Sequence, residues 1–196
     1  MKLILARHAE TQANKNGIFS GWTDYPLTEK GKTQAEKLAY ELKKNYNIDE
    51  MYSSPLGRAM TTAGVISKSI EREIITTECL KEINFGLFEG KTSEQIGTHH
   101  GDHWENWYTD YVNYRIPNGE NLIDLLSRIK PLIDNLRSTD KTCLLVAHSG
   151  VIQVAITYLL DIELTKMWNF KVKNCSYVEF ECNDEITFIK QLWNMN

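Results

Sequence analysis

The sequence has no long hydrophobic run and few cysteines. The apolar run near the N-terminus, residues 3–6, is too short for the core of a signal peptide or for a membrane span. The four cysteines form no CxxC pair, and their spacing is typical neither of a zinc site nor of the disulfide framework of a small secreted domain. These absences predict a soluble, reduced protein of the cytoplasm.

The sequence also lacks linkers and any excess of positive charge. No stretch is rich in Pro, Gly or Ser and no repeat occurs, which predicts one domain over residues 1–196. Hydrophobic residues make up 42% of the chain, enough for a packed core. A net charge of -4 provides no overall field that would attract nucleic acid or an anionic membrane. Attraction of an anionic substrate must therefore be local.

Segments with the patterns of strands and helices alternate along the chain. Residues 3–6 and 142–147 are continuous apolar runs, typical of strands buried on both faces. Further strands are predicted at 50–53, 176–181 and 185–193. Helices are predicted at 31–45, 59–70, 119–137 and 151–160. The alternation predicts an α/β fold, a three-layer α/β/α sandwich around a mostly parallel sheet.

Two of the predicted helices carry recognisable end signals. Thr28 is placed to cap the helix over 31–45, and Asn118 to cap the helix over 119–137. Pro131 lies inside the second of these and is expected to kink or split it, because proline lacks the N–H that the helix needs.

The two continuous apolar strands end in the same way. Arg7-His8 follows the first, and His148-Ser149-Gly150 follows the second. Strands of a parallel sheet end at one edge, where ligands bind, so the two histidines are expected to meet. Either histidine alone is more typical of a structural residue. Both together, one preceded by an arginine, favour a functional site, and Arg58 after the strand at 50–53 would allow two arginines to hold a phosphate.

The chain resembles the histidine phosphatase superfamily, which includes the cofactor-dependent phosphoglycerate mutases. The likeness runs across nearly the whole chain and rests on four motifs in order. The first is RHAET at residues 7–11, followed by GWTD at 21–24. The others are SSPLGRAMTTA at 53–63, KEINFGLFEG at 81–90 and LLVAHSG at 144–150. The resemblance implies a phosphoglycerate mutase-like fold and a small phosphate ester as the binding partner, with a homodimer left open.

The resemblance also implies the roles of the site residues. His8 attacks phosphorus and carries the phosphoryl group. Glu82 protonates the leaving oxygen and then accepts a proton from water. The non-bridging oxygens are bound by Arg7, Arg58 and His148, with Asn14 as a further donor. Fixed cations of this kind stabilise the charge of the transition state, so no cofactor and no metal are expected.

Two positions depart from the family pattern. Ala9 and Ser149 stand where the family more often has glycine. Alanine at position 9 keeps the backbone N–H. The hydroxyl of Ser149 is expected to reach the phosphate or the substrate. Gly21, in the first motif, is also expected to contact the substrate. Neither change removes a catalytic group.

Two further signals are discounted. The histidines of residues 99–103 are suitable metal ligands, but no paired ligand set occurs elsewhere, so they are interpreted as part of a loop. The stripe Trp104, Trp107, Tyr108, Tyr111 and Tyr114 follows helical spacing. Such a stripe more often packs in a core, although part of it would also serve as an apolar wall for the ring of a substrate.

The length favours hydrolysis, because the mutases of the family carry extra residues that this chain lacks. Among the short members the chain is most similar to the α-ribazole phosphatases of adenosylcobalamin synthesis, through RHAETQAN, GIFSGWTDYPLTEKG, RIPNGEN and MWNFKVKNCSY. The alternative is a broad-specificity phosphatase, which shares several of these segments. A mutase or an inactive phosphate-binding relative fits less well, since all the catalytic residues are present.

Overall fold

A six-stranded sheet forms the centre of the computed structural model, which describes residues 1–183 and 186–194. Its strands follow the order β3-β2-β4-β1-β5-β6. They are β1 (Lys2–Arg7), β2 (Glu50–Ser53), β3 (Ile74–Thr76), β4 (Thr142–Ala147), β5 (Tyr177–Cys182) and β6 (Thr187–Trp193). The first four in this order run parallel, and β5 and β6 pair antiparallel. The mostly parallel sheet is confirmed.

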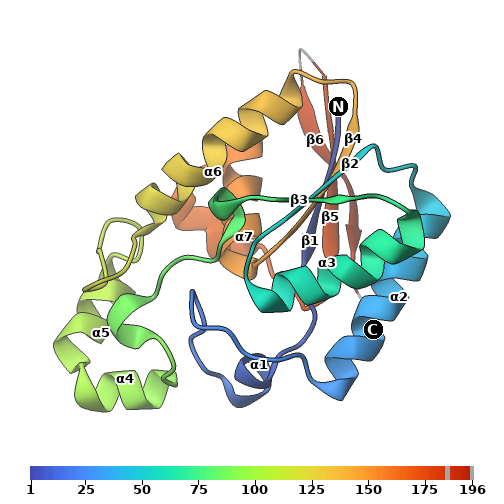
Figure 1. Ribbon diagram of the computed structural model, residues 1–196. Coiled ribbons are helices and arrows are strands. Elements are labelled where there is room, and N and C mark those ends of the chain that lie inside the picture. The colour runs from blue at the N-terminus through green and yellow to red at the C-terminus, as the bar shows by residue number, and fades with distance from the viewer. Residues whose placement is uncertain (184–185, 195–196) are drawn as a thin grey trace.

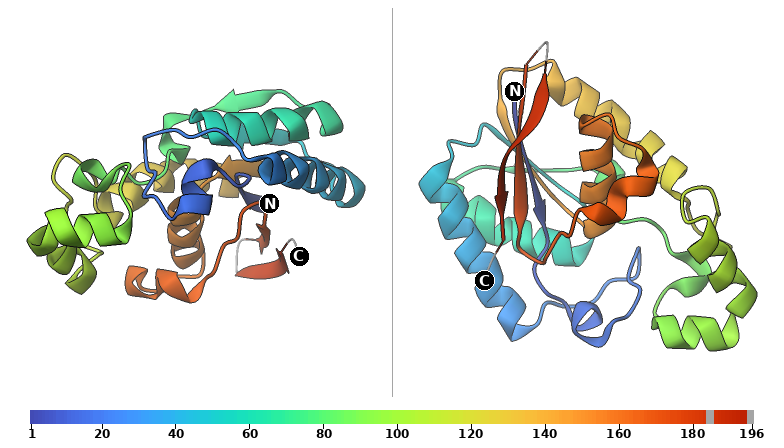
Figure 2. Two further views of the ribbon diagram at one scale, coloured as in Figure 1. Left: turned by 90° about the horizontal axis from the view of Figure 1, so that it is seen from below. Right: turned by 180° about the vertical axis from the view of Figure 1, so that it is seen from behind.

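Helices cover both faces of the sheet, so the predicted three-layer sandwich is also confirmed (Figures 1 and 2). The α-helices are α1 (Gln12–Asn16), α2 (Glu29–Asn45), α3 (Gly57–Ile70), α4 (Ser93–His99), α5 (Gly101–Thr109), α6 (Leu122–Arg137) and α7 (Ser149–Leu159). Short 3-10 helices are η1 (Glu78–Leu80), η2 (Gly86–Phe88) and η3 (Leu164–Asn169). Helices α2 and α3 pack on one face, and α6 and α7 on the other.

The interiors of the two central strands, β1 and β4, are apolar because both of their faces are buried. In β1, Leu3 and Leu5 belong to the core shared with α6 and α7, whereas Ile4 and Ala6 belong to the core shared with α2 and α3. Successive side chains of a strand point to opposite faces, so each face needs its own apolar set. This burial leaves the polar residues only at the strand ends.

The predicted ends of helix α6 need correction. The helix begins at Leu122, and its N-cap is Asn121. In a capping box, the backbone N–H of Asp124 donates to the Asn121 side chain, and the backbone N–H of Asn121 donates to the Asp124 carboxylate. Asn118 instead has a positive φ of 60° in the turn before it. Pro131 does not split the helix, which runs unbroken to Arg137. Thr28 caps α2 as predicted. The predicted start of the last strand, Glu185, lies outside the described residues.

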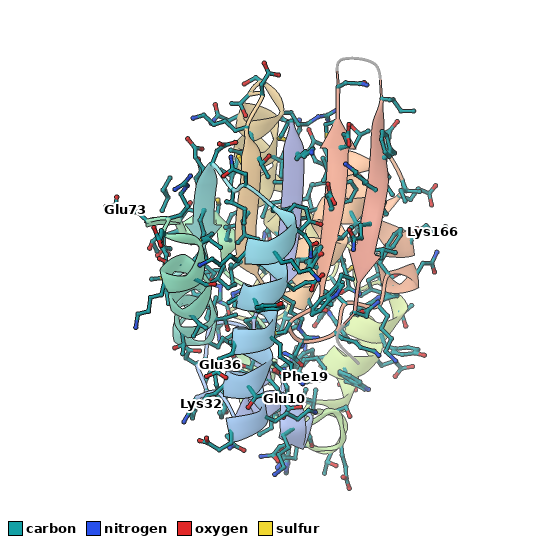
Figure 3. All side chains as sticks on the ribbon, turned by 90° about the vertical axis from the view of Figure 1, so that its right-hand side faces the viewer. Glu10, Phe19, Lys32, Glu36, Glu73 and Lys166 are labelled. Carbon is teal, nitrogen blue, oxygen red and sulfur yellow. The ribbon has the colours of Figure 1, made fainter. Side chains whose placement is uncertain are left out.

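Strands β1, β2 and β4 end on the same side of the molecule, toward the bottom of Figure 1. The loop after β1 lies there, and Figure 3 shows Glu10 and Phe19 at this end, below the strands. Helices α4 and α5 stand away from the sheet to one side of this loop (Figure 1). The strand ends and these outlying segments together surround the candidate site.

Candidate active site

His8 follows the last residue of β1 and is almost fully buried. Its Nδ1 lies 2.7 Å from the carbonyl oxygen of Ala9. A carbonyl only accepts, so Nδ1 carries the ring hydrogen and Nε2 keeps its lone pair. Burial, and then the charges of Arg7 and Arg58, lower the pKa of His8 well below its usual value. The ring is thus a neutral imidazole, the form that a nucleophile requires.

His148 occupies the equivalent place after β4 and is also the N-cap residue of α7. Its ring centroid lies 5.1 Å from that of His8. The side chain is completely buried, and Nε2 lies 2.8 Å from Oγ of Ser54. Burial, followed by the neighbouring His8 and Arg58, lowers the pKa of His148 well below its usual value. The two strand ends bring the two histidines together.

Two fully buried side-chain nitrogens in this cluster have no hydrogen-bond partner. Arg7 donates through Nη1 to the carbonyl oxygen of Val172 at 2.7 Å, but its Nε is buried without a partner. Nδ1 of His148 is the other. Throughout the described ranges, no other buried side-chain nitrogen or oxygen lacks a partner. A buried unpaired polar atom is costly, so both nitrogens indicate a place where a polar ligand would bind.

Arg58, in the first turn of α3, is buried and grips the loop over residues 20–24. Its Nη2 donates to the carbonyl oxygens of Ser20 at 3.0 Å and Gly21 at 2.6 Å. Its Nη1 donates to the carbonyl oxygen of Thr23 and to the carboxylate of Asp24, both at 3.1 Å. The structure thus places Arg58 beside the two histidines, while its contact with a phosphate stays a prediction.

Glu89 holds the same loop from the other side, a role that sequence reasoning missed. Its carboxylate accepts four backbone N–H groups at 2.8–3.1 Å, those of Gly21, Trp22, Thr23 and Phe85. Gly21 is needed here, because a Cβ would lie 2.1 Å from the carbonyl oxygen of Ile83. Both backbone groups of Gly21 are occupied within the loop, and its predicted contact with substrate is untested.

Glu82 is held between two elements of the site. It is 8% exposed, Oε1 accepts from the backbone N–H of Ile83 at 3.0 Å, and Oε2 accepts from that of Gly150 at 3.1 Å. A Cβ on Gly150 would lie 2.5 Å from Oε1, so glycine makes room for the carboxylate. The turn that carries His148 therefore also positions Glu82.

Arg128 of α6 fixes the segment before Glu82, and the sequence analysis did not find it. Its Nη1 donates to the carbonyl oxygens of Cys79 at 2.7 Å and Lys81 at 2.8 Å. Its guanidinium also pairs with Glu120 through two bonds at 2.9 and 3.1 Å. The available signal was an arginine in the middle of the apolar stripe of a helix, where a cation needs buried partners.

Asn14 and Asn174 tie α1 to the chain after η3. The Oδ1 of Asn14 accepts from the N–H of Thr11 at 3.1 Å and from Nδ2 of Asn174 at 3.0 Å. The Nδ2 of Asn14 thus remains as its donor group, which fits the predicted role of Asn14 as a donor to the phosphate. Asn174, which sequence reasoning did not single out, also donates to the carbonyl oxygen of His8 at 3.1 Å.

An apolar cavity of about 180 Å³ adjoins Glu82 and Ser149. A second cavity, of about 440 Å³, shares three of its aromatic residues, Trp107, Tyr111 and Trp168. We call these three residues the aromatic wall. Met167 and Trp168 come from η3 and were missing from the predicted wall. None of the described residues that line either cavity is Lys, Arg or His.

The predicted aromatic stripe is only partly a wall and does not form one helix. Helix α5 ends at Thr109, and Trp104 packs against Phe19 and Phe88 in a small separate core. Tyr108 is mostly exposed but lines the second cavity, that of about 440 Å³. Nδ1 of His103 lies 2.6 Å from the hydroxyl of Tyr114. Within residues 1–183 and 186–194, no three His, Cys, Asp or Glu side chains are grouped to hold a metal ion.

A profile of the Histidine phosphatase superfamily (branch 1) matches residues 3–195, nearly the whole chain that carries this site. The chain belongs to the histidine phosphatase superfamily. The resemblance stated from the four motifs is therefore confirmed.

In the described part of this superfamily member, no helix is long and apolar enough to cross a membrane.

Several named relatives of this superfamily member are phosphatases. It is 32% identical over 179 residues to phosphoserine phosphatase 1 of Hydrogenobacter thermophilus, covering 90% of this chain and 84% of that protein. It is 32% identical over 177 residues to the adenosylcobalamin/alpha-ribazole phosphatase of Salmonella typhimurium, covering 88% and 86%. The structure of the alpha-ribazole phosphatase from Shigella flexneri is similar with a TM-score of 0.89 at 29% identity, covering 98% and 96%. The predicted enzyme class, a phosphatase, agrees with these names.

Proposed function

We propose that this protein hydrolyses phosphate monoesters through a phosphohistidine at His8. The observation that carries the proposal is the pair of buried nitrogens without partners, Nε of Arg7 and Nδ1 of His148, in one cluster with the neutral ring of His8. A phosphoryl group offers three acceptor oxygens and negative charge, which match these buried nitrogens.

In the first step of this mechanism, Nε2 of His8 bonds to phosphorus as the bond to the leaving oxygen breaks. Glu82 gives its proton to that oxygen, and the alcohol leaves. In the second step, the Glu82 carboxylate takes a proton from water, whose oxygen bonds to phosphorus as the P–N bond breaks. Inorganic phosphate leaves and His8 is restored. The guanidinium groups of Arg7 and Arg58 offset the charge of both transition states, and His148 donates a hydrogen bond to the phosphoryl group.

For the substrate we propose α-ribazole 5'-phosphate, whose benzimidazole ring fits the aromatic wall. The cavity beside Glu82 begins where the leaving oxygen would lie and continues past Trp107, Tyr111 and Trp168. Stacking a ring on such side chains stabilises binding by about 1–3 kcal/mol, by analogy with bases on aromatic residues. The similarity to two named α-ribazole phosphatases supports the same substrate.

A charged leaving group fits this side of the site less well. Phosphoserine, the substrate named for a relative of similar identity, would place a carboxylate in cavities whose described lining contains no Lys, Arg or His. Burying a carboxylate without a partner is costly. The lining of these two cavities therefore favours an aromatic leaving group, whereas lysines line a separate cavity next to Arg7.

The test compares kcat/KM for α-ribazole 5'-phosphate, ribose 5-phosphate and phosphoserine. We expect α-ribazole 5'-phosphate to exceed ribose 5-phosphate by roughly tenfold to hundredfold, the equivalent of one stacked ring. Equal values for the two ribose esters would support the broad-specificity alternative instead. A preference for phosphoserine would contradict the aromatic leaving group.

Two further expectations belong to this proposal. We propose a cytoplasmic location, supported by the four cysteines, all of which are free. We also propose that the chain is a single domain, supported by the pairing of β1 with both β4 and β5, which joins early and late segments in one sheet.

A further inference from the structure

Ser54 contacts the Nε2 atom of the second histidine, His148. It follows β2, is completely buried, and its backbone N–H donates to the carbonyl oxygen of Val146 in β4 at 3.0 Å. Its Oγ lies 2.8 Å from Nε2 of His148 and accepts the backbone N–H of Leu56 at 3.3 Å. Backbone and hydroxyl are thus both held in place.

The contact with Leu56 decides how the hydroxyl is oriented. A serine oxygen accepts hydrogen bonds but has a single hydrogen to donate. The N–H of Leu56 can only donate to Oγ, so of the two hydrogen-bond partners of Oγ only Nε2 of His148 can accept the buried hydroxyl hydrogen. Donation to Nε2 requires that the ring proton of the neutral imidazole sit on Nδ1.

Nδ1 is also the nitrogen that a phosphate needs as a donor. It is buried and has no partner, whereas Nε2 is already occupied by Ser54. In the opposite tautomer Nδ1 would present a lone pair, which repels an anionic oxygen. In that tautomer the buried hydroxyl hydrogen of Ser54 would also have no acceptor among the partners of Oγ, so only the Nδ1–H tautomer satisfies both ends of the ring.

We propose that Ser54 is a positioning residue that holds His148 as the Nδ1–H tautomer, so that Nδ1 donates to a phosphoryl oxygen. This inference rests on the proposed function and deepens it, because it assigns a proton to one atom of the site. If the ring gains a second proton near bound phosphate, the same hydroxyl can accept from Nε2 and keep the contact.

Ser53 offers a matched control. It is adjacent in sequence and equally buried, but its hydroxyl donates to the backbone carbonyl of Ser54 at 3.0 Å and does not contact His148. S53A and S54A therefore each remove one buried hydroxyl, and only S54A removes the contact with the histidine. S54T keeps a hydroxyl at the same position.

The experiment combines ¹⁵N NMR of the His148 ring in the substrate-free protein with kcat/KM. We expect the Nδ1–H tautomer in wild type, S53A and S54T, and a mixture of tautomers in S54A. We also expect kcat/KM to fall about 10- to 100-fold in S54A and to return with S54T.

The Nε2–H tautomer in the wild-type spectrum would overturn the proposal even if S54A did not fold. An S54A protein with unchanged tautomer and rate would overturn it as well. Absence of phosphatase activity in wild type would instead refute the proposed function, while the spectrum would still report the tautomer.

Discussion

The charged side and the aromatic side of the site are built in different ways. His8 and His148 follow central strands whose backbones pair with each other along their full length, and Arg58 lies in the first turn of α3, the helix that follows β2. The aromatic wall instead comes from α5, the loop after it and η3, outside the central sheet (Figure 1). In the proposed function, the reaction chemistry thus depends on the strand ends, whereas substrate choice depends on peripheral segments.

The largest effect should come from the charged side. His8→Ala removes the nucleophile, and we expect kcat/KM to fall by at least about 10³-fold with every phosphate ester, since losing a nucleophile disables the whole mechanism. Steady-state kinetics on α-ribazole 5'-phosphate and p-nitrophenyl phosphate provide the measurement. Activity near the wild-type level would contradict the role of His8 as nucleophile and the assignment of the chemistry to the charged side of the site.

Glu82 lies where the two sides meet, so its effect should depend on the leaving group. Glu82→Gln cannot protonate the leaving oxygen, and we expect a loss of about 10²–10⁴-fold with alkyl esters. With p-nitrophenyl phosphate, whose phenolate leaves unaided, the loss should be much smaller. Kinetics with both esters on the same preparation provide an internal control. Equal losses would assign Glu82 a structural role.

On the aromatic side, Trp168→Ala should change selectivity and leave the chemistry intact. We expect the preference for α-ribazole 5'-phosphate over ribose 5-phosphate to fall roughly tenfold, the loss of one stacking contact. Hydrolysis of p-nitrophenyl phosphate should change little. Tyr40→Ala, which removes an exposed ring on α2 outside the cavity lining, is the matched control. A loss that is equal for all three esters would mean that the two sides are not separable.

The smallest effect concerns the pH dependence of the free energy of unfolding, to which the charged side of the site should contribute and the aromatic side should not. Burial lowers the pKa of His8 and His148 well below the usual value of 6.5. Below that pH the unfolded chain binds protons that the folded histidines do not, so the free energy of unfolding should fall as the pH falls. The slope is at most ~1.4 kcal/mol per pH unit for each histidine. Urea melts from pH 7 to 5 measure it.

The double variant H8Q/H148Q provides the comparison for these melts. It lacks both buried histidines, so its stability should depend less on pH over this range. A slope identical to that of the wild type would show that other groups cause the dependence. Trp168→Ala, which changes no titratable group, should keep the wild-type slope.

The same division explains which residues the sequence could predict. Arg7-His8 and His148-Ser149 are joined directly to continuous apolar runs, so their place at one sheet edge follows from local pattern. Arg58 follows a strand in the same way. Trp168 has no periodic relation to Trp107, and only tertiary packing brings it to the wall. The helix cap at Asn121 was missed for a related reason, because Asn118 is equally suitable by type and the bond to Asp124 decides.

Trapping the reaction intermediate tests the central claim most directly. Wild-type protein mixed with a substrate labelled in its phosphate and quenched within milliseconds should carry label that is labile in acid and stable in base, and peptide mapping should place it on His8. The His8→Ala variant should carry none. Absence of label from the wild-type protein during turnover, or label on any residue other than His8, would contradict a phosphohistidine mechanism at the end of β1.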